Sequence, residues 1–501
     1  MDQKSKDSAA DPSPTRVFGK DALNYVPVQI IPAIVGFFAI AAYTRLLNPE
    51  QYGQYILTIS TISIVSSAAF SWLNQSGLRY FEEYKTKGLF RQFTSTAFIS
   101  LFVSLAIILF IWSGVTIVIN KIWHSDLIRL IQIGGVVLAT QTIYLFILVL
   151  LRADRKSFKY SLYVVLNSLG TFLVAICLIK FANLGSEGIL LAMIAFSGGI
   201  SFFELIRFVR NNLIKISNYS INLLKRFALY GVPMIGVSMG ALVVSVSDRY
   251  MIQYLMDTKA VGIYSASYSI AEKGMQGISG MLMLAALPVI FQTFAQKGEK
   301  ETSILLGRLI GIYFIALVPV IFGVSILSKD IVGVVLGKSF VDSYIILPWI
   351  AGGIFCDGLA LYYSVSFKLK EKTKFLFYIW ALAAVVNIIL NAFCIPKFGI
   401  LGAAYATLIA YFVCLTMFLM FGVKLLPFVF QWQNLWKTVL AAFIMAITLK
   451  VGFSSITIGI IPLISKIVFG TLAYFILLWV LRERIFLDTL KFGVGYFRFF
   501  Q

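Results

Sequence analysis

A series of long apolar segments constrains the fold of this chain more than any other feature. A helix rises about 1.5 Å per residue, so about 20 apolar residues cross a hydrocarbon core of about 30 Å. Hydropathy predicts about fourteen such helices. Their expected limits are residues 22–47, 53–74, 93–119, 127–151, 160–181, 187–209, 228–255, 261–291, 303–327, 343–367, 375–395, 400–423, 435–451 and 460–481. Since a water-soluble fold could not enclose so much apolar surface, we expect an all-α polytopic membrane protein.

The composition supports a membrane setting. Of 501 residues, 59% are hydrophobic and 13% are charged, whereas soluble domains have about 45–50% apolar and about 25% charged residues. The four cysteines (Cys177, Cys356, Cys394 and Cys414) lie in apolar segments without CxxC spacing, so we interpret them as packing residues. The first apolar segment is too long for a signal peptide and lacks its cleavage site, so we expect a membrane helix there.

The distribution of positive charge predicts the topology. A net charge of +20 would favour nucleic acid as the partner of a soluble protein, but here its distribution matters more than its sum. Most of the 42 Lys and Arg residues fall in alternate loops, starting with the N-terminal tail and ending with the C-terminal tail. Because positive loops stay inside, we expect both termini in the cytoplasm, an even number of spans in the cytoplasmic membrane, and no nucleic-acid partner.

An internal repeat predicts two lobes. Residues 46–55 (LLNPEQYGQY) align without gaps with residues 255–264 (LMDTKAVGIY). Further on, aligning Lys180 with Lys397 brings Gly185 onto Gly402. Six helices per half is an even number, so both halves enter the membrane in the same direction, with a cleft between them. The alternative is chance similarity, because glycines and aromatic residues cluster at membrane interfaces.

These observations predict six regions along the chain. We expect a cytoplasmic tail at residues 1–20, an N-lobe at 21–210, a cytoplasmic linker at 211–227, a C-lobe at 228–424, two further helices at 425–481, and a cytoplasmic tail at 482–501.

Three stretches of the chain resemble a known family. They are NIILNAFCIPKFGILGAAYAT at residues 387–407, RLLNPEQYGQY at 45–55 and DRYMIQYLMDTKAVGIYSASYSIAE at 248–272. Their order, in a layout of twelve helices plus two, is similar to that of polysaccharide flippases in the multidrug/oligosaccharidyl-lipid/polysaccharide exporter superfamily. The resemblance covers residues 21–423.

This resemblance implies a fold and a cargo. The fold would be two six-helix lobes in a V that opens alternately to either face of the membrane. A cationic central cavity would carry a polyprenyl-diphosphate-linked oligosaccharide, such as an O-antigen unit, toward the cell surface. A polysaccharide polymerase and glycosyltransferases of the same pathway, together with membrane lipids, would then be the partners.

Four basic residues are candidates for binding the diphosphate. Lys273 lies about 18 Å along its predicted helix, near the middle of the hydrocarbon core, where an ionisable group needs a partner, a cavity or a ligand. Arg249, Arg45 and Arg79 end predicted helices, and guanidinium groups hold phosphates in a forked geometry. The alternatives are a structural ion pair for Lys273, neutralisation of Arg249 by Asp248, and snorkelling of Arg45 and Arg79 to the interface.

Polar and proline residues supply further candidates. Asn387 and Asn391 share one helix face, where they could contact sugars or join two helices by hydrogen bonds. Pro27 and Pro32 should bend or break the first helix, which suits a gate but is also common in membrane helices.

Acidic residues inside the predicted spans are candidates for ion coupling. If protons or sodium drive transport, Glu204, Glu272, Asp357 and Asp248 are the groups that could bind the ion. Asp357 ranks first because no adjacent basic residue neutralises it. We expect no cofactor beyond such an ion.

No enzyme motif is present in the sequence. His124 is the only histidine, and the GxxxxGK[ST] pattern of phosphate-binding loops does not occur, so we expect no catalytic residues and no metal site. The rival classes are a membrane-embedded polysaccharide polymerase or lipid-dependent glycosyltransferase, and a drug exporter of the same superfamily. The outer loops are short for the first class, and a drug exporter should have an acidic cavity, whereas this one is expected to be basic.

Overall fold

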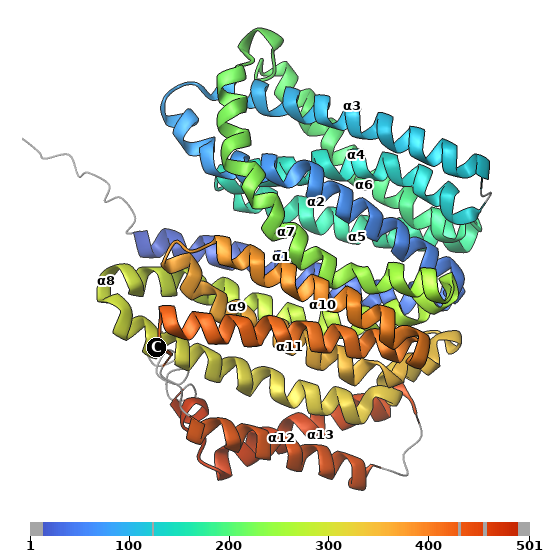
Figure 1. Cartoon of the computed structure of the whole chain (residues 1–501), viewed down its shortest axis with the longest axis vertical. Helices are drawn as coiled ribbons and strands as arrows, with labels where there is room; N and C mark the ends of the chain where they lie inside the picture. The colour runs from blue at the N-terminus through green and yellow to red at the C-terminus, as the bar shows by residue number, and fades with distance from the viewer. Residues whose placement is uncertain (1–13, 123–124, 429–431, 454–457, 489–501) are drawn as a thin grey trace, which may run out of the picture.

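The computed structural model describes residues 14–122, 125–428, 432–453 and 458–488, and within them it is helical without strands (Figure 1). The helices are α1 (Pro14–Leu46), α2 (Pro49–Thr86), α3 (Phe90–Ile122), α4 (Asp126–Ala153), α5 (Ser157–Phe181), α6 (Gly185–Arg210), the 3-10 turn η1 (Ile216–Asn218), α7 (Ile221–Leu255), α8 (Thr258–Val335), η2 (Lys338–Ile345), α9 (Leu347–Leu369), α10 (Lys374–Phe398), α11 (Ile400–Leu425), α12 (Trp432–Gly452) and α13 (Ile460–Val480).

The expected all-α membrane fold is confirmed, and each expected helix has a counterpart. Helix α8 contains two of them, because the chain turns back at Gly298, whose φ of 77° suits a residue without a side chain. Helix α9 starts at Leu347, after the η2 turn, rather than at residue 343, and a proline occupies its first turn. Helix α1 runs unbroken through both prolines, so the expected break is absent; the side chain of Pro27 lies outside the described residues.

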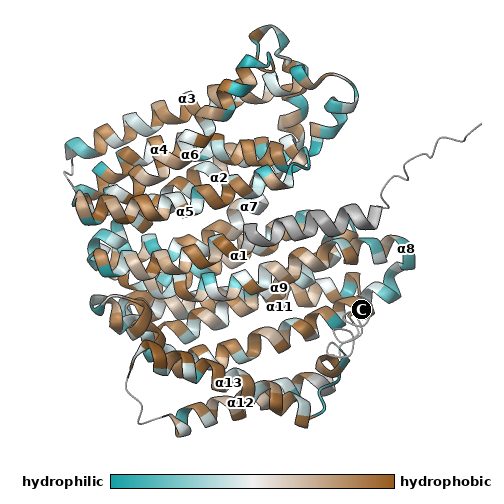
Figure 2. Cartoon of the chain, turned by 180° about the vertical axis from the view of Figure 1, so that it is seen from behind, coloured by the Kyte–Doolittle hydropathy of each residue, from teal (hydrophilic) through white to brown (hydrophobic). Residues whose placement is uncertain are grey.

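The surface of the bundle is apolar along the helices and polar at their ends (Figure 2). Large side chains such as Phe110, Phe158 and Trp479 are exposed on it. A soluble protein does not expose apolar patches of this extent. Together with twelve described helices that are long and apolar enough to cross a membrane, this surface indicates a multi-pass membrane protein.

Three groups of packed helices are visible in Figure 1. Helices α1 to α6 pack among themselves, with α4 against α2 and α6 and with α5 against α1 and α6. Helices α8 to α11 form the second group, and the pair α12 and α13 packs on α8. Helix α7 lies against both α2 and α10, so it joins the first two groups.

The two repeat segments meet at the N-terminal ends of α2 and α8. Asn48 caps α2 by accepting a hydrogen bond from the N–H of Gln51 at 2.8 Å, and Asp257 caps α8 by accepting from the N–H of Ala260 at 2.6 Å. Asn48 and Asp257 occupy equivalent positions in the aligned segments 46–55 and 255–264. The sequence repeat therefore corresponds to a repeated local structure.

Just inside these caps, the backbones of α2 and α8 touch at two equivalent glycines. A Cβ atom added at Gly53 would lie 2.1 Å from the carbonyl oxygen of Thr258, and one added at Gly262 would lie 1.8 Å from that of Pro49. Real Cβ atoms do not come within 3.0 Å of such neighbours. Pro49 and Thr258 are themselves equivalent, so the contact is reciprocal, as a two-fold axis between the lobes requires. We call it the glycine contact.

The lobes share a core at the glycine contact, and toward Gly298 they also meet where the first turns of α7 pack on α2. One cluster of buried residues there combines Tyr52 of α2 with Tyr264 of α8 and with residues of α1, α5, α9 and α11. The other large clusters stay within one lobe, apart from the first turns of α7. Along α8, residues 260–271 are almost all buried, whereas from Lys273 onward one side of the helix is exposed. The bundle is thus closed at the glycine contact, whereas toward Gly298 one side of α8 is exposed while α7 stays packed on α2.

A side chain at Gly53 should open the closed end. We expect Gly53→Val to force α2 away from α8, because its Cβ would overlap the Thr258 carbonyl. In a variant without the four native cysteines, Ser269→Cys on α8, which lies beside Tyr52 of α2, should then react several-fold faster with a membrane-impermeant maleimide. Gly114→Val is the control, because a Cβ there has no neighbour within 4 Å. Equal labelling in both variants would contradict the assignment of the glycine contact as a closed gate.

Candidate functional site

Several of the expected charged residues meet inside the second lobe, close to the glycine contact. They form a group with hydroxyl-bearing side chains from α7, α8, α9 and α11, which we call the polar cluster. Its members are Asp248, Arg249, Tyr264, Tyr268, Glu272, Asp357 and Thr407.

Asp248 and Arg249 are buried side by side on α7 but do not form a side-chain ion pair. The Asp248 carboxylate accepts hydrogen bonds from the N–H of Arg249 at 2.8 Å, from the Tyr264 hydroxyl, and from the Thr407 hydroxyl at 3.5 Å. The Arg249 guanidinium carbon lies 4.9 Å from the centre of the Tyr268 ring, a cation–π contact. The expected neutralisation is therefore indirect, and Arg249 keeps an Nε–H without a hydrogen-bond partner.

Glu272 and Asp357 extend the cluster toward the open end. Glu272 lies one turn beyond Tyr268 on α8 and interacts electrostatically with Arg249, and Asp357 of α9 interacts with Glu272. Both carboxylates are half-buried, and neither forms an ion pair with another described residue. The structure thus places Asp248 and Glu272 close to Arg249, with Asp357 beside Glu272. This region therefore combines basic and acidic groups, because α7, α8 and α9 meet here.

Lys273 lies beside this cluster and points toward the first lobe. Its side chain is exposed, and its stem passes Gly36 of α1, where an added Cβ would lie 3.6 Å from the lysine Cδ. Among the described residues it has no ion-pair partner. The structural ion pair, which was the alternative for this residue, therefore has no support in the described part of the chain.

Arg45 and Arg79 lie away from the cluster. Arg45 is exposed at the end of α1 and donates to the carbonyl of Val334 near the end of α8. Arg79 is exposed near the other end of α2, with its guanidinium carbon 5.8 Å from the Tyr80 ring centre. Both positions favour the interpretation of these arginines as interface residues.

Asn387 and Asn391 are fully buried between helices. The Asn391 amide donates to the Asn387 side-chain oxygen at 2.9 Å, and the Ser247 hydroxyl of α7 donates to the same oxygen at 2.7 Å. The geometry favours helix packing over sugar contact for this pair.

Glu204 also lies apart from the cluster, near the Gly298 end of α6. Its carboxylate pairs with Lys159 at 2.5 Å and accepts a hydrogen bond from Tyr163. It borders a small pocket of about 190 Å³ that also includes Asp154. Burial alone would raise the pKa of Asp154, but hydrogen bonds and charge from Lys156 and Lys85 lower that pKa below its ordinary value. These ion pairs indicate a structural role at the end of the bundle.

The tyrosines of the cluster were not among the site residues predicted from the sequence. Tyr264, Tyr268 and Glu272 recur every four residues and therefore share one face of α8. That spacing was the available signal. Aromatic residues are common in membrane helices, so this four-residue spacing could not be distinguished from ordinary helix packing.

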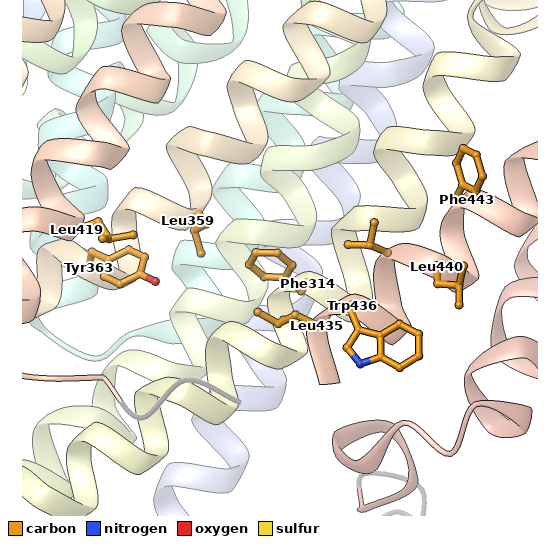
Figure 3. Close-up of a pocket in the computed structure, with 9 residues that line it drawn as sticks. Phe314, Leu359, Tyr363, Leu419, Leu435, Trp436, Leu440 and Phe443 are labelled. Carbon is orange, nitrogen blue, oxygen red and sulfur yellow. The ribbon is translucent and has the colours of Figure 1, made fainter. Parts of the chain in front are cut away.

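An apolar groove lies apart from the cluster, between α8, α9, α11 and α12 (Figure 3). It has a volume of about 630 Å³, and side chains such as Phe314, Leu359 and Trp436 line it. Without charged groups among its lining residues, it cannot hold a diphosphate.

Comparison with known proteins identifies the family. The profile of a family described as "Polysaccharide biosynthesis protein" matches residues 18–294, more than half of the chain. The "Putative O-antigen transporter" of Shigella flexneri is 25% identical over 394 residues, which is 75% of this chain and 90% of that protein. The "Probable low-salt glycan biosynthesis flippase Agl15" of Haloferax volcanii is 24% identical over 240 residues, 47% of this chain and only half of that protein.

Solved structures share the fold. The lipid II flippase MurJ in an inward closed conformation superposes with a TM-score of 0.71 at 16% identity, covering 92% of this chain and 98% of that one. An inward-facing multidrug resistance MATE family transporter of the MOP superfamily gives 0.65 at 13% identity, covering 80% and 97%. Taken together, the family match and the shared fold show that this chain belongs to the polysaccharide biosynthesis protein family.

Proposed function

We propose that this protein is a flippase that moves polyprenyl-diphosphate-linked oligosaccharides across the cytoplasmic membrane for cell-surface polysaccharide synthesis. The observation that carries the proposal is Lys273, an exposed cation without an ion-pair partner among the described residues, which lies beside the polar cluster of the second lobe and passes Gly36 of the first. The names of the two relatives, a flippase and an O-antigen transporter, support the same function.

Each part of such a cargo has a counterpart in the protein. The Lys273 ammonium can attract the diphosphate, since charge-assisted contacts are strong where water is scarce. Tyrosine hydroxyls such as that of Tyr268 can hydrogen-bond sugar hydroxyls, and the lipid tail can stay in the bilayer. Asp248 does not oppose the anion strongly, because the charge of the neighbouring Arg249 offsets that of its carboxylate.

Alternating access requires two ends that open in turn. The glycine contact closes one end, and the exposed side of α8 beyond Lys273 belongs to the other. Lys297 and Lys300 flank the turn at Gly298, and positive loops stay in the cytoplasm. We therefore propose that the structure faces inward, with both termini in the cytoplasm.

The rival functions fit less well. A polymerase or glycosyltransferase would need a reaction site, whereas the relatives carry transporter names. A drug exporter needs a cavity that attracts cations, and the polar cluster does contain acids. The unpaired Lys273 at its open side favours an anion over such a drug. A pathway partnership with a polymerase and glycosyltransferases follows from the proposed cargo.

Reporter fusions test the orientation. We expect a reporter placed after Gln501 and one placed beside Gly298 to be active in the cytoplasm, because both sites adjoin positive loops. Alkaline phosphatase and green fluorescent protein activities distinguish the two sides. An external signal from either fusion would reverse the proposed orientation.

Lys273→Ala tests the cargo. We expect this variant to lose surface export of the polysaccharide while its abundance in the membrane stays normal, because the side chain is exposed. Lys273→Arg should keep part of the export, since the charge remains but its donor geometry changes. Lys259→Ala, an exposed lysine on the same helix, should export normally.

Two results would count against the role of Lys273. Full export by Lys273→Ala would show that this charge does not bind the cargo. A fall in protein level would instead assign Lys273 to a structural ion pair, because breaking a buried pair costs about 3–5 kcal/mol.

Asp357 is the proposed site of ion coupling. Binding a proton or sodium ion there would cancel one negative charge beside Glu272 and so make the cavity more attractive to a diphosphate. We expect Asp357→Asn to remain abundant but to lose the dependence of export on an imposed proton or sodium gradient. Asp342→Asn is the control, because Asp342 is exposed on η2. Unchanged gradient dependence in Asp357→Asn would exclude this residue.

A further inference from the structure

A second polar pocket lies on the other side of the glycine contact, outside the closed end of the bundle. It has a volume of about 640 Å³, within the range of about 300–1,000 Å³ that is usual for small-molecule sites. Its walls come from α2 and from α3 and α4 of the first lobe, and from α7 and α8 of the second. Thr258 lines it and also provides the carbonyl that Gly53 touches, so the pocket borders the glycine contact.

Four carboxamide side chains line this pocket. They are Gln54, Asn120, Gln132 and Gln253. No hydrogen bond joins these side chains to another described residue, and the Gln253 oxygen is buried without a partner. A carboxamide both donates and accepts, as a sugar hydroxyl does. An unpaired buried amide is costly unless a ligand or water satisfies it, so the pocket is suited to a polar ligand.

The charges in the pocket exclude an anionic ligand. Glu50 and Asp126 contribute two carboxylates. Arg129 is the basic residue in the lining, and its Nε already lies 3.1 Å from the Glu187 carboxylate. Within the described residues there is also no group of three acidic, histidine or cysteine side chains that could hold a metal ion. Four carboxamides that both donate and accept suit a neutral, hydroxyl-rich molecule, for which the carboxylates serve as additional acceptors.

We propose that this pocket binds the sugar part of the translocated oligosaccharide after its passage through the bundle. That the bound sugar is part of the transported oligosaccharide rests on the proposed function. Because both lobes supply the walls, separation of α2 from α8 at the glycine contact would pull the pocket apart. A bound sugar therefore stabilises the closed gate, which keeps delivered cargo from returning.

The test uses the full chain in lipid nanodiscs and a defined probe. The probe is the oligosaccharide released by mild acid from the lipid-linked pool of cells that lack this gene, and binding is measured by saturation-transfer NMR titration. We expect Gln132→Leu and Gln253→Leu each to weaken binding about fivefold, the loss expected for about 1 kcal/mol of hydrogen bonding. Gln75→Leu, an exposed glutamine of α2 outside the pocket, is the matched control.

Two further measurements link binding to the gate and to charge. Gly53→Val should weaken binding of the same probe, since it opens the glycine contact, whereas Gly114→Val should not. Inorganic diphosphate should not compete with the probe. Competition by diphosphate would place the probe in the central cavity and overturn the proposal.

The outcomes separate this inference from the proposed function. Suppose that the wild-type gene supports normal export. The pocket alone is then refuted if the probe does not bind, or if the glutamine variants and the control bind it equally. Failure of the wild-type gene to support export would refute the flippase function itself. If Gln132→Leu is poorly folded, Gln132→Asn, which keeps the amide on a shorter side chain, must show the same loss.

Discussion

The approach of two backbones at Gly53 and Gly262 is the constraint on which the arrangement of the lobes depends. At this distance the contact is made by peptide groups, and any side chain would push the helices apart by more than an ångström. Small residues allow such approaches in membranes, where lipid tails provide no hydrophobic force that brings helices together. Because the two glycines are equivalent in the repeat, each lobe supplies the same kind of surface to the contact. In the proposed alternating access, this end would open by separation of these two surfaces.

The polar cluster behind this contact combines opposite charges whose interactions are not saturated. Arg249 is held by the Tyr268 ring, Asp248 by hydroxyl groups, and Glu272 and Asp357 stay half-exposed without ion pairs among the described residues. If every charge in the cluster were paired, its net charge would be fixed. The carboxylates near Lys273 have no ion pair among the described residues, so the net charge of the site can change when one of them binds a cation. Under the proposed function, an anionic cargo and a coupling cation would favour each other's binding, which is what coupled transport needs.

Hydropathy predicted the helices well because the transfer of each segment into lipid depends on its own residues. The repeat aligned Gly53 with Gly262 but did not predict that their backbones touch. The neighbours of single polar residues could not be predicted in this way. Asn387 meets Ser247, and Glu204 meets Lys159, only because α10 packs on α7 and α6 on α5. The proximity of Asp357 to Glu272 likewise follows from the packing of α9 on α8, which no local pattern encodes.

Polar contacts also decide where the apolar helices lie. Lys466 of α13 is almost fully buried and pairs with Asp330 of α8 at 3.0 Å, although both neighbouring surfaces are otherwise apolar. Such a pair is expensive to bury, but in lipid an unpaired lysine would cost more. The pair therefore fixes the register of α13 against the second half of α8. Attached to α8 in this way, α12 and α13 belong to the second lobe and lie away from the contact between α2 and α8.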